Sequence, residues 1–174
     1  VKKSETLICH HLKELLRGYC SLKYLIGGDR KMNKYEINKI GISFAEKIFQ
    51  SYGFFIDRSP ETRGPIDFYA LLNDKRIKIK VRAISQIGSY VFLEKRRFNI
   101  CDPDLFMAVA YVPHNEDEKI LYLMPATEWG KDIYPFKGKD YPGLSSEPEW
   151  GMCFSQKAKD ALEPYRFSNI IAVI

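Results

Sequence analysis

Hydrophobic and polar residues repeat along the chain with two different periods, and each period predicts a different kind of element. Over residues 35–52 the apolar positions recur every three or four residues, a spacing that places them on one side of a helix. These positions are Ile37, Ile40, Phe44, Ile48 and Phe49. Gly53 follows where a glycine commonly ends a helix. The pattern therefore predicts an amphipathic helix over residues 35–52.

Alternating segments and unbroken apolar runs follow this helix and predict strands. Residues 76–82 alternate strictly between basic and apolar side chains, which is typical of a strand with one buried and one exposed face. Residues 105–112 form a continuous apolar run, as expected of a central strand buried on both faces. Shorter strands are predicted at 54–56, 66–72, 90–93 and 120–124. The last of these is the expected hairpin partner of the central strand.

The C-terminal part of the chain shows weaker periodicity. Residues 126–151 are rich in Pro, Gly, Trp and Tyr and are predicted to be irregular, with aromatic side chains that pin loops to the core. Residues 155–162 predict a helix that Ser155 caps and that ends before Pro164. The order of elements predicts an α/β fold, with α+β as the alternative, built on a mixed central β-sheet flanked by helices.

Charge is distributed unevenly along the 174 residues, whose net charge is +5. Residues 1–31 contain seven Lys and Arg against three Asp and Glu, whereas residues 32–174 contain 20 against 19. The larger part is therefore almost neutral. A polyanionic partner cannot be argued from the global charge, and the argument needs local clusters of basic side chains.

The first 31 residues admit two interpretations. Leucines near helical spacing, followed by Gly27 and Gly28, predict an N-terminal helix. The alternative is that the native start is Met32 and that residues 1–31 are upstream sequence read in frame. In both cases residues 32–174 are predicted to form one domain. Because no apolar run approaches the roughly 20 residues that cross a bilayer, and no signal-peptide pattern is present, we expect a soluble cytoplasmic protein with no membrane partner.

Candidate chemistry comes from three polar residues in three predicted elements: the first helix, the second strand and the strand after it. Glu46 lies on the first helix, Asp67 lies early in a strand, and Lys80 lies on the next strand. Carboxylates that converge at one sheet edge can bind Mg²⁺, and a neighbouring lysine can stabilise charge that develops on a phosphate. The cysteines and histidines show no spacing typical of a zinc site. The constellation favours a metal-dependent phosphodiesterase.

Three short segments resemble the PD-(D/E)XK nuclease superfamily, which includes many restriction endonucleases and the archaeal Holliday-junction resolvases. They are Gly41-Ile42-Ser43-Phe44-Ala45-Glu46, Gly64-Pro65-Ile66-Asp67 and Lys78-Ile79-Lys80, and the resemblance covers about residues 35–112. Segments between residues 122 and 151 are also similar to bacterial proteins associated with this superfamily.

The resemblance implies a restriction-endonuclease-like fold and Mg²⁺-dependent hydrolysis of phosphodiester bonds in DNA. Asp67 and Glu46 would bind the metal, and Lys80 would complete the catalytic set by orienting water or stabilising the transition state. Many members of the superfamily work as dimers, so a homodimer is compatible with the resemblance. DNA is the expected partner.

The sequence departs from the superfamily pattern at Lys78. The pattern expects Glu, Asp or sometimes Gln there, and a lysine pointing into the site would repel Mg²⁺. Either the missing carboxylate comes from Asp57, Glu61 or Glu94, or the fold has lost hydrolysis. The alternative function is a catalytically inactive nuclease-fold protein that binds nucleic acid or a protein partner through a basic strand face.

Basic side chains along the alternating strand and just after the fourth predicted strand are candidates for phosphate contacts. The nucleic-acid-binding candidates are Arg76, Lys78, Arg82, Lys95, Arg96 and Arg97. The strand residues are expected to project from one exposed face, where they repel one another unless an anion or acidic neighbours neutralise them. Two interpretations remain for this face: a surface that binds a phosphate backbone, or a solvated sheet face with no nucleic-acid role.

Overall fold

The computed structural model describes residues 32–58, 64–113 and 119–174. The two interpretations of residues 1–31 and the candidate donor Glu61 lie outside these ranges. Residues Asn33–Ile174 form one compact unit. None of the helices in the described ranges combines the length and apolar composition that a membrane crossing needs.

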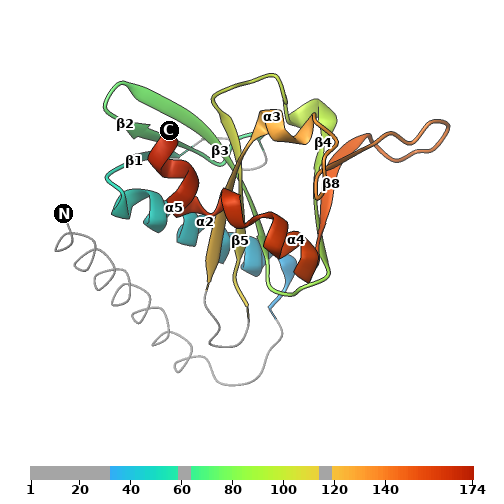
Figure 1. Ribbon diagram of the computed structural model, residues 1–174, viewed down its shortest axis with the longest axis horizontal. Coiled ribbons are helices and arrows are strands. Elements are labelled where there is room, and N and C mark those ends of the chain that lie inside the picture. The colour runs from blue at the N-terminus through green and yellow to red at the C-terminus, as the bar shows by residue number, and fades with distance from the viewer. Residues whose placement is uncertain (1–31, 59–63, 114–118) are drawn as a thin grey trace. The chain divides into compact units, whose positions relative to one another are not determined.

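Helices and strands alternate irregularly along this unit (Figure 1). In chain order they are α2 (Lys34–Ser51), β1 (Phe55–Arg58), β2 (Phe68–Leu72), β3 (Lys75–Ile84), β4 (Ser89–Glu94), β5 (Leu105–Tyr111), β6 (Ile120–Pro125), α3 (Ala126–Trp129), β7 (Lys137–Lys139), β8 (Glu149–Phe154), α4 (Gln156–Ala161) and α5 (Phe167–Ile170). Short 3₁₀ helices at Lys95–Arg97, Glu163–Tyr165 and Ile171–Val173 complete the chain.

Five strands form the central sheet in the order β1-β2-β3-β5-β6. The pair β3–β5 is parallel and the other three pairs are antiparallel, which confirms the expected mixed sheet. All seven residues of β5 are buried, as the unbroken apolar run predicted, and β6 is its antiparallel neighbour. Helix α2 lies across this sheet in Figure 1, so the expectation of a mixed sheet flanked by helices is confirmed.

Helix α2 begins at a capping box and packs closely on the central sheet. The side chain of Asn33 accepts a hydrogen bond from the backbone N–H of Glu36, and Glu36 accepts one from the backbone N–H of Asn33. A Cβ added to Gly41 would lie 2.3 Å from the Cβ of Ala83 on β3, so this face of the helix packs in close contact with the strand. Gly53 ends the helix region at φ +87°, as the sequence predicted.

A second sheet of three strands, in the order β4-β8-β7, corrects the prediction that residues 126–151 are irregular. Strand β7 has only three residues, and β8 pairs with β4, about 60 positions earlier in the chain. A local pattern carries little signal for such pairing, because the hydrogen bonds come from a distant strand. In Figure 1 the β7–β8 hairpin extends away from the rest of the described unit.

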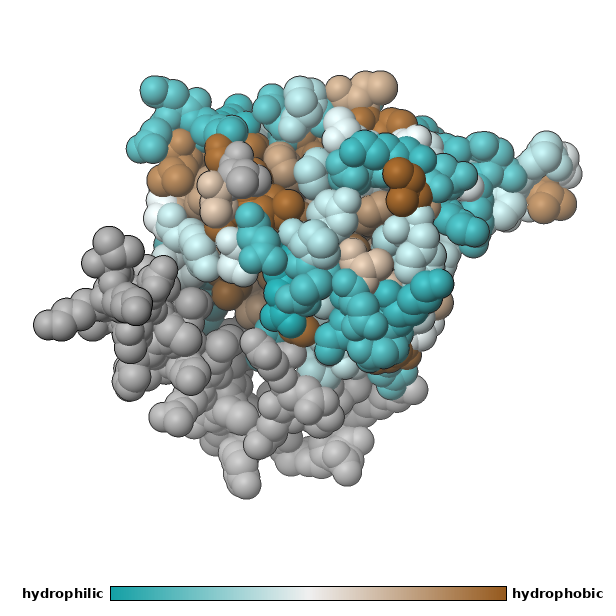
Figure 2. Space-filling model, in the orientation of Figure 1, coloured by the Kyte–Doolittle hydropathy of each residue, from teal (hydrophilic) through white to brown (hydrophobic). Residues whose placement is uncertain are grey.

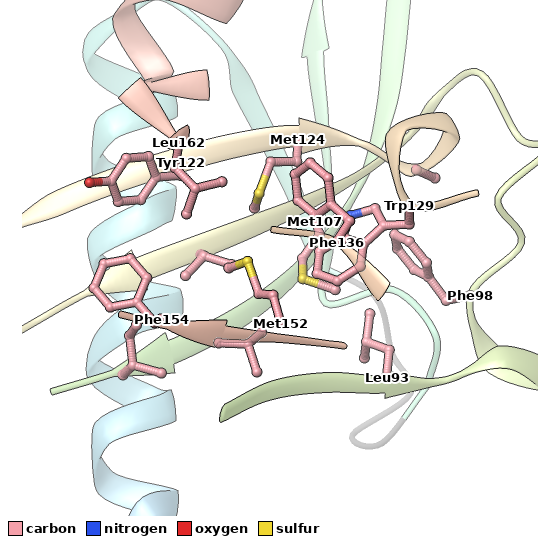
Figure 3. Packing of buried hydrophobic residues seen from close by; sticks show 14 of the residues in the cluster. Leu93, Phe98, Met107, Tyr122, Met124, Trp129, Phe136, Met152, Phe154 and Leu162 are labelled. Carbon is pink, nitrogen blue, oxygen red and sulfur yellow. The ribbon is translucent and has the colours of Figure 1, made fainter. Parts of the chain in front are cut away.

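The main hydrophobic core lies between the two sheets. Figure 3 shows three methionines, from β5, β6 and β8, between two groups of larger side chains. The methionines are Met107, Met124 and Met152, with Phe98, Trp129 and Phe136 at one end and Tyr122, Phe154 and Leu162 at the other. Trp129 and Phe136 are buried, so the prediction that such aromatic residues pin loops to the core is confirmed for these two.

The remaining C-terminal elements close one end of this core. Ser155 caps α4 by accepting a hydrogen bond from the backbone N–H of Ala158, as predicted. The short helices after Pro164 were not predicted. On the face drawn in Figure 2, hydrophilic residues predominate and hydrophobic residues gather in small separate patches.

Candidate functional site

The pairing of β2 with β3 brings Asp67 opposite Lys80. Phe68 faces Ile79 in the antiparallel register, and the backbone N–H of Asp67 donates to the Ile79 carbonyl at 2.8 Å. The Nζ of Lys80 then lies 3.1 Å from Oδ1 of Asp67. Two of the three predicted catalytic residues are therefore in direct contact.

The Asp67 carboxylate is held by nitrogen atoms on both of its oxygens. Besides the contact of Oδ1 with Lys80, Oδ2 accepts a hydrogen bond of 2.7 Å from the backbone N–H of Val81. Lys80 in turn donates to the carbonyl of Gly64 at 2.8 Å. The Asp67–Lys80 pair therefore links the segment before β2 to β3, and this link is a structural role.

Burial of Lys80 corrects the prediction that the whole basic face of β3 is exposed. Only 7% of Lys80 is accessible to solvent. Desolvation lowers the pKa of Lys80; Asp67 opposes this shift, and the nearby Arg82 reinforces it. Ile84, further along the same face, belongs to the core between the sheets, so the second sheet covers part of the face that the sequence predicted to be solvated.

Glu46 is buried in a contact that the sequence did not predict. Its two oxygens accept hydrogen bonds from the Nε and Nη2 atoms of Arg58, both at 2.8 Å, in a bidentate pair. This hydrogen bonding raises the pKa of Arg58. Among the described residues, Glu46 and Asp67 share no hydrogen-bond partner. The two predicted metal ligands therefore have separate partners.

Lys78, at the position where an acidic residue was expected, contacts Asp102 rather than Asp67. Its Nζ lies 2.7 Å from Oδ2 of Asp102, and this hydrogen bond raises the pKa of Lys78. Asp102 belongs to the turn before β5, and the backbone N–H of Lys78 donates to the carbonyl of Asp104 in the same turn. The expected conflict between Lys78 and the site is removed because this turn supplies its counter-charge.

The alternative acidic donors are also engaged with cations. Asp57 lies 3.6 Å from Arg76, and Glu94 lies 2.9 Å from Arg96 and 3.0 Å from Arg97. Within the ranges that the structure describes, no three His, Cys, Asp or Glu side chains gather as a metal site requires.

The donor set does not fit Mg²⁺ as it is arranged. Mg²⁺ is bound by oxygen ligands and needs one or two carboxylates facing it. Both oxygens of Asp67 and both oxygens of Glu46 receive hydrogen bonds from nitrogen, three of them from cationic side chains. A divalent cation at Asp67 would also lie next to the Lys80 ammonium group, at a high electrostatic cost.

Three basic side chains instead form what we call the cation cluster: Lys80, Arg82 and Arg97. Lys80 and Arg82 are two residues apart on one face of β3, and Arg97 lowers the pKa of both. For Arg82 the largest effect is burial, which lowers its pKa, while Asp67 and Glu94 oppose that shift. Three cations thus share two carboxylates.

Arg82 has unused hydrogen-bonding capacity and differs from Lys80 and Arg97 in its partners. Its Nε donates to the carbonyl of Phe92 at 3.3 Å and its Nη1 to the carbonyl of Val81 at 3.2 Å. Among the described residues it forms no ion pair with a carboxylate within 4.0 Å. A guanidinium group has five N–H donors, so part of this fork remains available.

The other nucleic-acid-binding candidates do not form a continuous row of unpaired basic side chains. Five of the six candidates lie within 4.0 Å of a carboxylate, and only Arg82 lacks such a partner in the described part of the chain. The pairs are Arg76–Asp57, Lys78–Asp102, Lys95–Asp140, Arg96–Glu94 and Arg97–Glu94. Acidic neighbours therefore neutralise much of the repulsion expected from the sequence.

Comparisons with known proteins add a likeness of fold. No protein-family model matches the chain, and no curated protein matches it either. One similar solved structure is Hjc of Archaeoglobus fulgidus, a Holliday junction resolvase from an archaeal hyperthermophile. It is 9% identical in sequence with a TM-score of 0.49, and the match covers 78% of this chain and 95% of that one.

Proposed function

We propose that this chain is a nuclease-fold protein that binds the phosphate backbone of DNA through the cation cluster. The observation that carries the proposal is the position of Arg82. It is half-buried beside Lys80 and Arg97, donates only to backbone carbonyls, and has no ion-paired carboxylate among the described residues.

A phosphate group supplies the hydrogen-bond acceptors and the negative charge that this cluster lacks. Its oxygens accept several hydrogen bonds from one guanidinium fork, and its negative charge relieves the repulsion among Lys80, Arg82 and Arg97. The ion pair between Arg97 and Glu94 is partly exposed, with 48% of the Arg97 side chain accessible. Exposed pairs contribute only about 0–1 kcal/mol, so a phosphate can compete with Glu94 for Arg97.

A Mg²⁺-dependent DNA endonuclease is the second candidate, and the contact between Asp67 and Lys80 favours it. In that function Asp67 and Glu46 would bind the metal and Lys80 would stabilise the charge developing on phosphate. The ion pairs of both carboxylates argue against this function, because Mg²⁺ would have to replace Lys80 and Arg58 as their partners.

Fluorescence anisotropy with a labelled DNA duplex, in the presence of EDTA, tests the first candidate. Arg82→Gln and Arg97→Gln should each weaken binding about tenfold, because each removes a charged phosphate contact. Lys131→Gln is the matched control, since Lys131 is an exposed basic residue paired with Glu128 in another part of the unit. It should leave the affinity within about twofold.

Two results would contradict the proposal. Absence of measurable binding to both a duplex and a single strand by the wild-type chain at low salt would exclude the DNA-binding function. Equal losses in Arg82→Gln, Arg97→Gln and Lys131→Gln would show that binding follows the total charge and not the cation cluster.

A further inference from the structure

The outer face of the second sheet carries exposed aromatic side chains that do not belong to the proposed phosphate site. Tyr90 is 41% exposed and Phe92 is 49% exposed, on the same face of β4. Their ring centroids are 6.0 Å apart and their planes differ by 18°. We call Tyr90 and Phe92 the aromatic platform. Large apolar side chains held this far out of the core often mark a binding surface.

The aromatic platform is held in place by its own neighbours. A Cβ on Gly151 would lie 2.2 Å from the Tyr90 hydroxyl, so the glycine on β8 allows the tyrosine ring to lie flat against the strand. The Tyr90 hydroxyl donates to Glu149 at 2.6 Å, and the Nζ of Lys139 lies 4.3 Å from the centre of the Tyr90 ring. The ring is therefore fixed before any ligand arrives, which lowers the entropic cost of binding.

Phe92 lies between two sources of positive charge. On one side its carbonyl accepts the hydrogen bond from Nε of Arg82, which belongs to the cation cluster. On the other side Phe92 pairs across the strands with Gly151, and Gly151 pairs with Lys137 on β7. Cross-strand partners share a face, so exposed Lys137 projects from the same side as the Phe92 ring.

This alternation of a cation, an exposed ring and a second cation fits one class of ligand. A single nucleic-acid strand has phosphates that bind cations and unpaired bases that stack on aromatic rings. A regular duplex keeps its bases stacked on each other and has no free base face for Phe92. A buried protein interface would bring the charges of Arg82, Lys137 and Lys139 out of water, at a desolvation cost.

We propose that the aromatic platform stacks unpaired bases of a DNA strand whose phosphates contact the cation cluster and Lys137. This inference rests on the proposed function and narrows its substrate class to DNA that contains single-stranded segments. Phe92 supplies the principal stacking surface because the Nζ of Lys139 already lies over the Tyr90 ring.

Phe92→Ala separates stacking from phosphate binding. The substitution removes the ring but keeps the backbone carbonyl that contacts Arg82. We expect the affinity for a labelled oligothymidylate of about 15 nucleotides to fall roughly tenfold, while the affinity for a duplex of equal length stays within about twofold. Phe92→Tyr should retain most of the single-strand affinity, because it retains an aromatic face.

Phe55→Ala is the matched control. Phe55 is 70% exposed on β1, an edge strand of the other sheet, and should leave both affinities unchanged. Sedimentation velocity of wild type and Phe92→Ala shows whether the platform instead joins two copies of the chain.

The outcomes separate this inference from the function on which it rests. Duplex binding that depends on Arg82, together with unchanged oligothymidylate binding in Phe92→Ala, would overturn the stacking proposal and leave the proposed function intact. A dimer that Phe92→Ala converts to monomer, with no change in oligothymidylate affinity, would also overturn it. Wild-type protein that binds neither DNA form would overturn both.

Discussion

At the scale of single residues, Asp67 and Lys80 form an ion pair that is largely removed from water. Their side chains are 16% and 8% exposed, and a second hydrogen bond to the Val81 N–H holds the carboxylate. In such a pair the loss of one member costs more than the pair itself contributes, because the remaining charge has no partner. The structural role of this contact is therefore measurable without any ligand.

Asp67→Ala should lower the free energy of unfolding by about 3 kcal/mol, because it leaves the buried Lys80 ammonium group without its counter-charge. Urea unfolding at neutral pH measures the change. Asp57→Ala is the control: Asp57 is 52% exposed in its pair with Arg76, and its loss should cost less than about 1 kcal/mol. The double variant Asp67→Ala/Lys80→Met should be more stable than Asp67→Ala alone. A double variant less stable than the single one would contradict this account.

Tyr122 provides a second prediction at this scale, and it concerns pH. Its side chain is fully buried, and its hydroxyl has no hydrogen-bond partner among the described residues. Burial raises the pKa of Tyr122 to about 12, while Arg166 opposes the shift. The pKa of Tyr122 is higher in the folded state than in the unfolded state. The contribution of neutral Tyr122 to the free energy of unfolding is therefore complete below about pH 10 and is lost as the pH rises toward 12.

The unfolding free energy should therefore decrease by roughly 1 kcal/mol between about pH 9 and about pH 11 through this residue. Tyr122→Phe should show a correspondingly smaller decrease in urea unfolding at the two pH values. Tyr35→Phe, at a position that is 76% exposed, should behave as wild type. An identical pH dependence in wild type and Tyr122→Phe would show that Tyr122 ionises equally in both states.

At the scale of elements, the packing of α2 on β3 depends on a glycine in the helix. The Cβ of an alanine at Gly41 would lie 2.3 Å from Ala83 and 3.2 Å from Ala110, on two neighbouring strands of the central sheet. Helix propensity alone would favour alanine by about 1 kcal/mol. The close approach reverses this preference, since helix and sheet would have to move apart.

Gly41→Ala should accordingly destabilise the fold by about 2 kcal/mol, the net result of overpacking and improved propensity. Thermal or urea unfolding measures the change. Lys39→Ala, at an exposed position of the same helix, should be nearly neutral. An increase in stability for Gly41→Ala would show that α2 is less closely packed than these contacts indicate.

Elements with local patterns were predictable, and those that depend on distant partners were not. The apolar spacing around Phe44 and the unbroken run of β5 contain the information for α2 and the central strand. Strand β7 has three residues, including Gly138, and exists through its pairing with β8. The buried Lys80 contacts Gly64 and Asp67 from an earlier segment of the chain, and the Glu46–Arg58 pair links residues 12 positions apart with no periodic signal. The contact of Asp67 with Lys80 followed from strand order.

At the scale of the whole molecule, the distribution of charge favours DNA binding over metal-dependent hydrolysis of DNA. Residues 32–174 are nearly neutral, and most basic candidates are paired with acids. DNA affinity should therefore come from a few contacts at the cation cluster rather than from a general positive field. The carboxylates that would bind a metal instead pair with cations, Asp67 with the buried Lys80 and Glu46 with the exposed Arg58.

The most direct test of this account is the affinity for a DNA duplex, measured by anisotropy against salt concentration, once in EDTA and once in Mg²⁺ at equal ionic strength. We predict equal affinities in the two buffers, intact DNA afterwards, and a slope of log affinity against log salt of about −2 to −3, as expected for roughly three phosphate contacts. Binding that requires Mg²⁺, with cleavage that Asp67→Asn abolishes, would contradict the account and identify a metal-dependent nuclease.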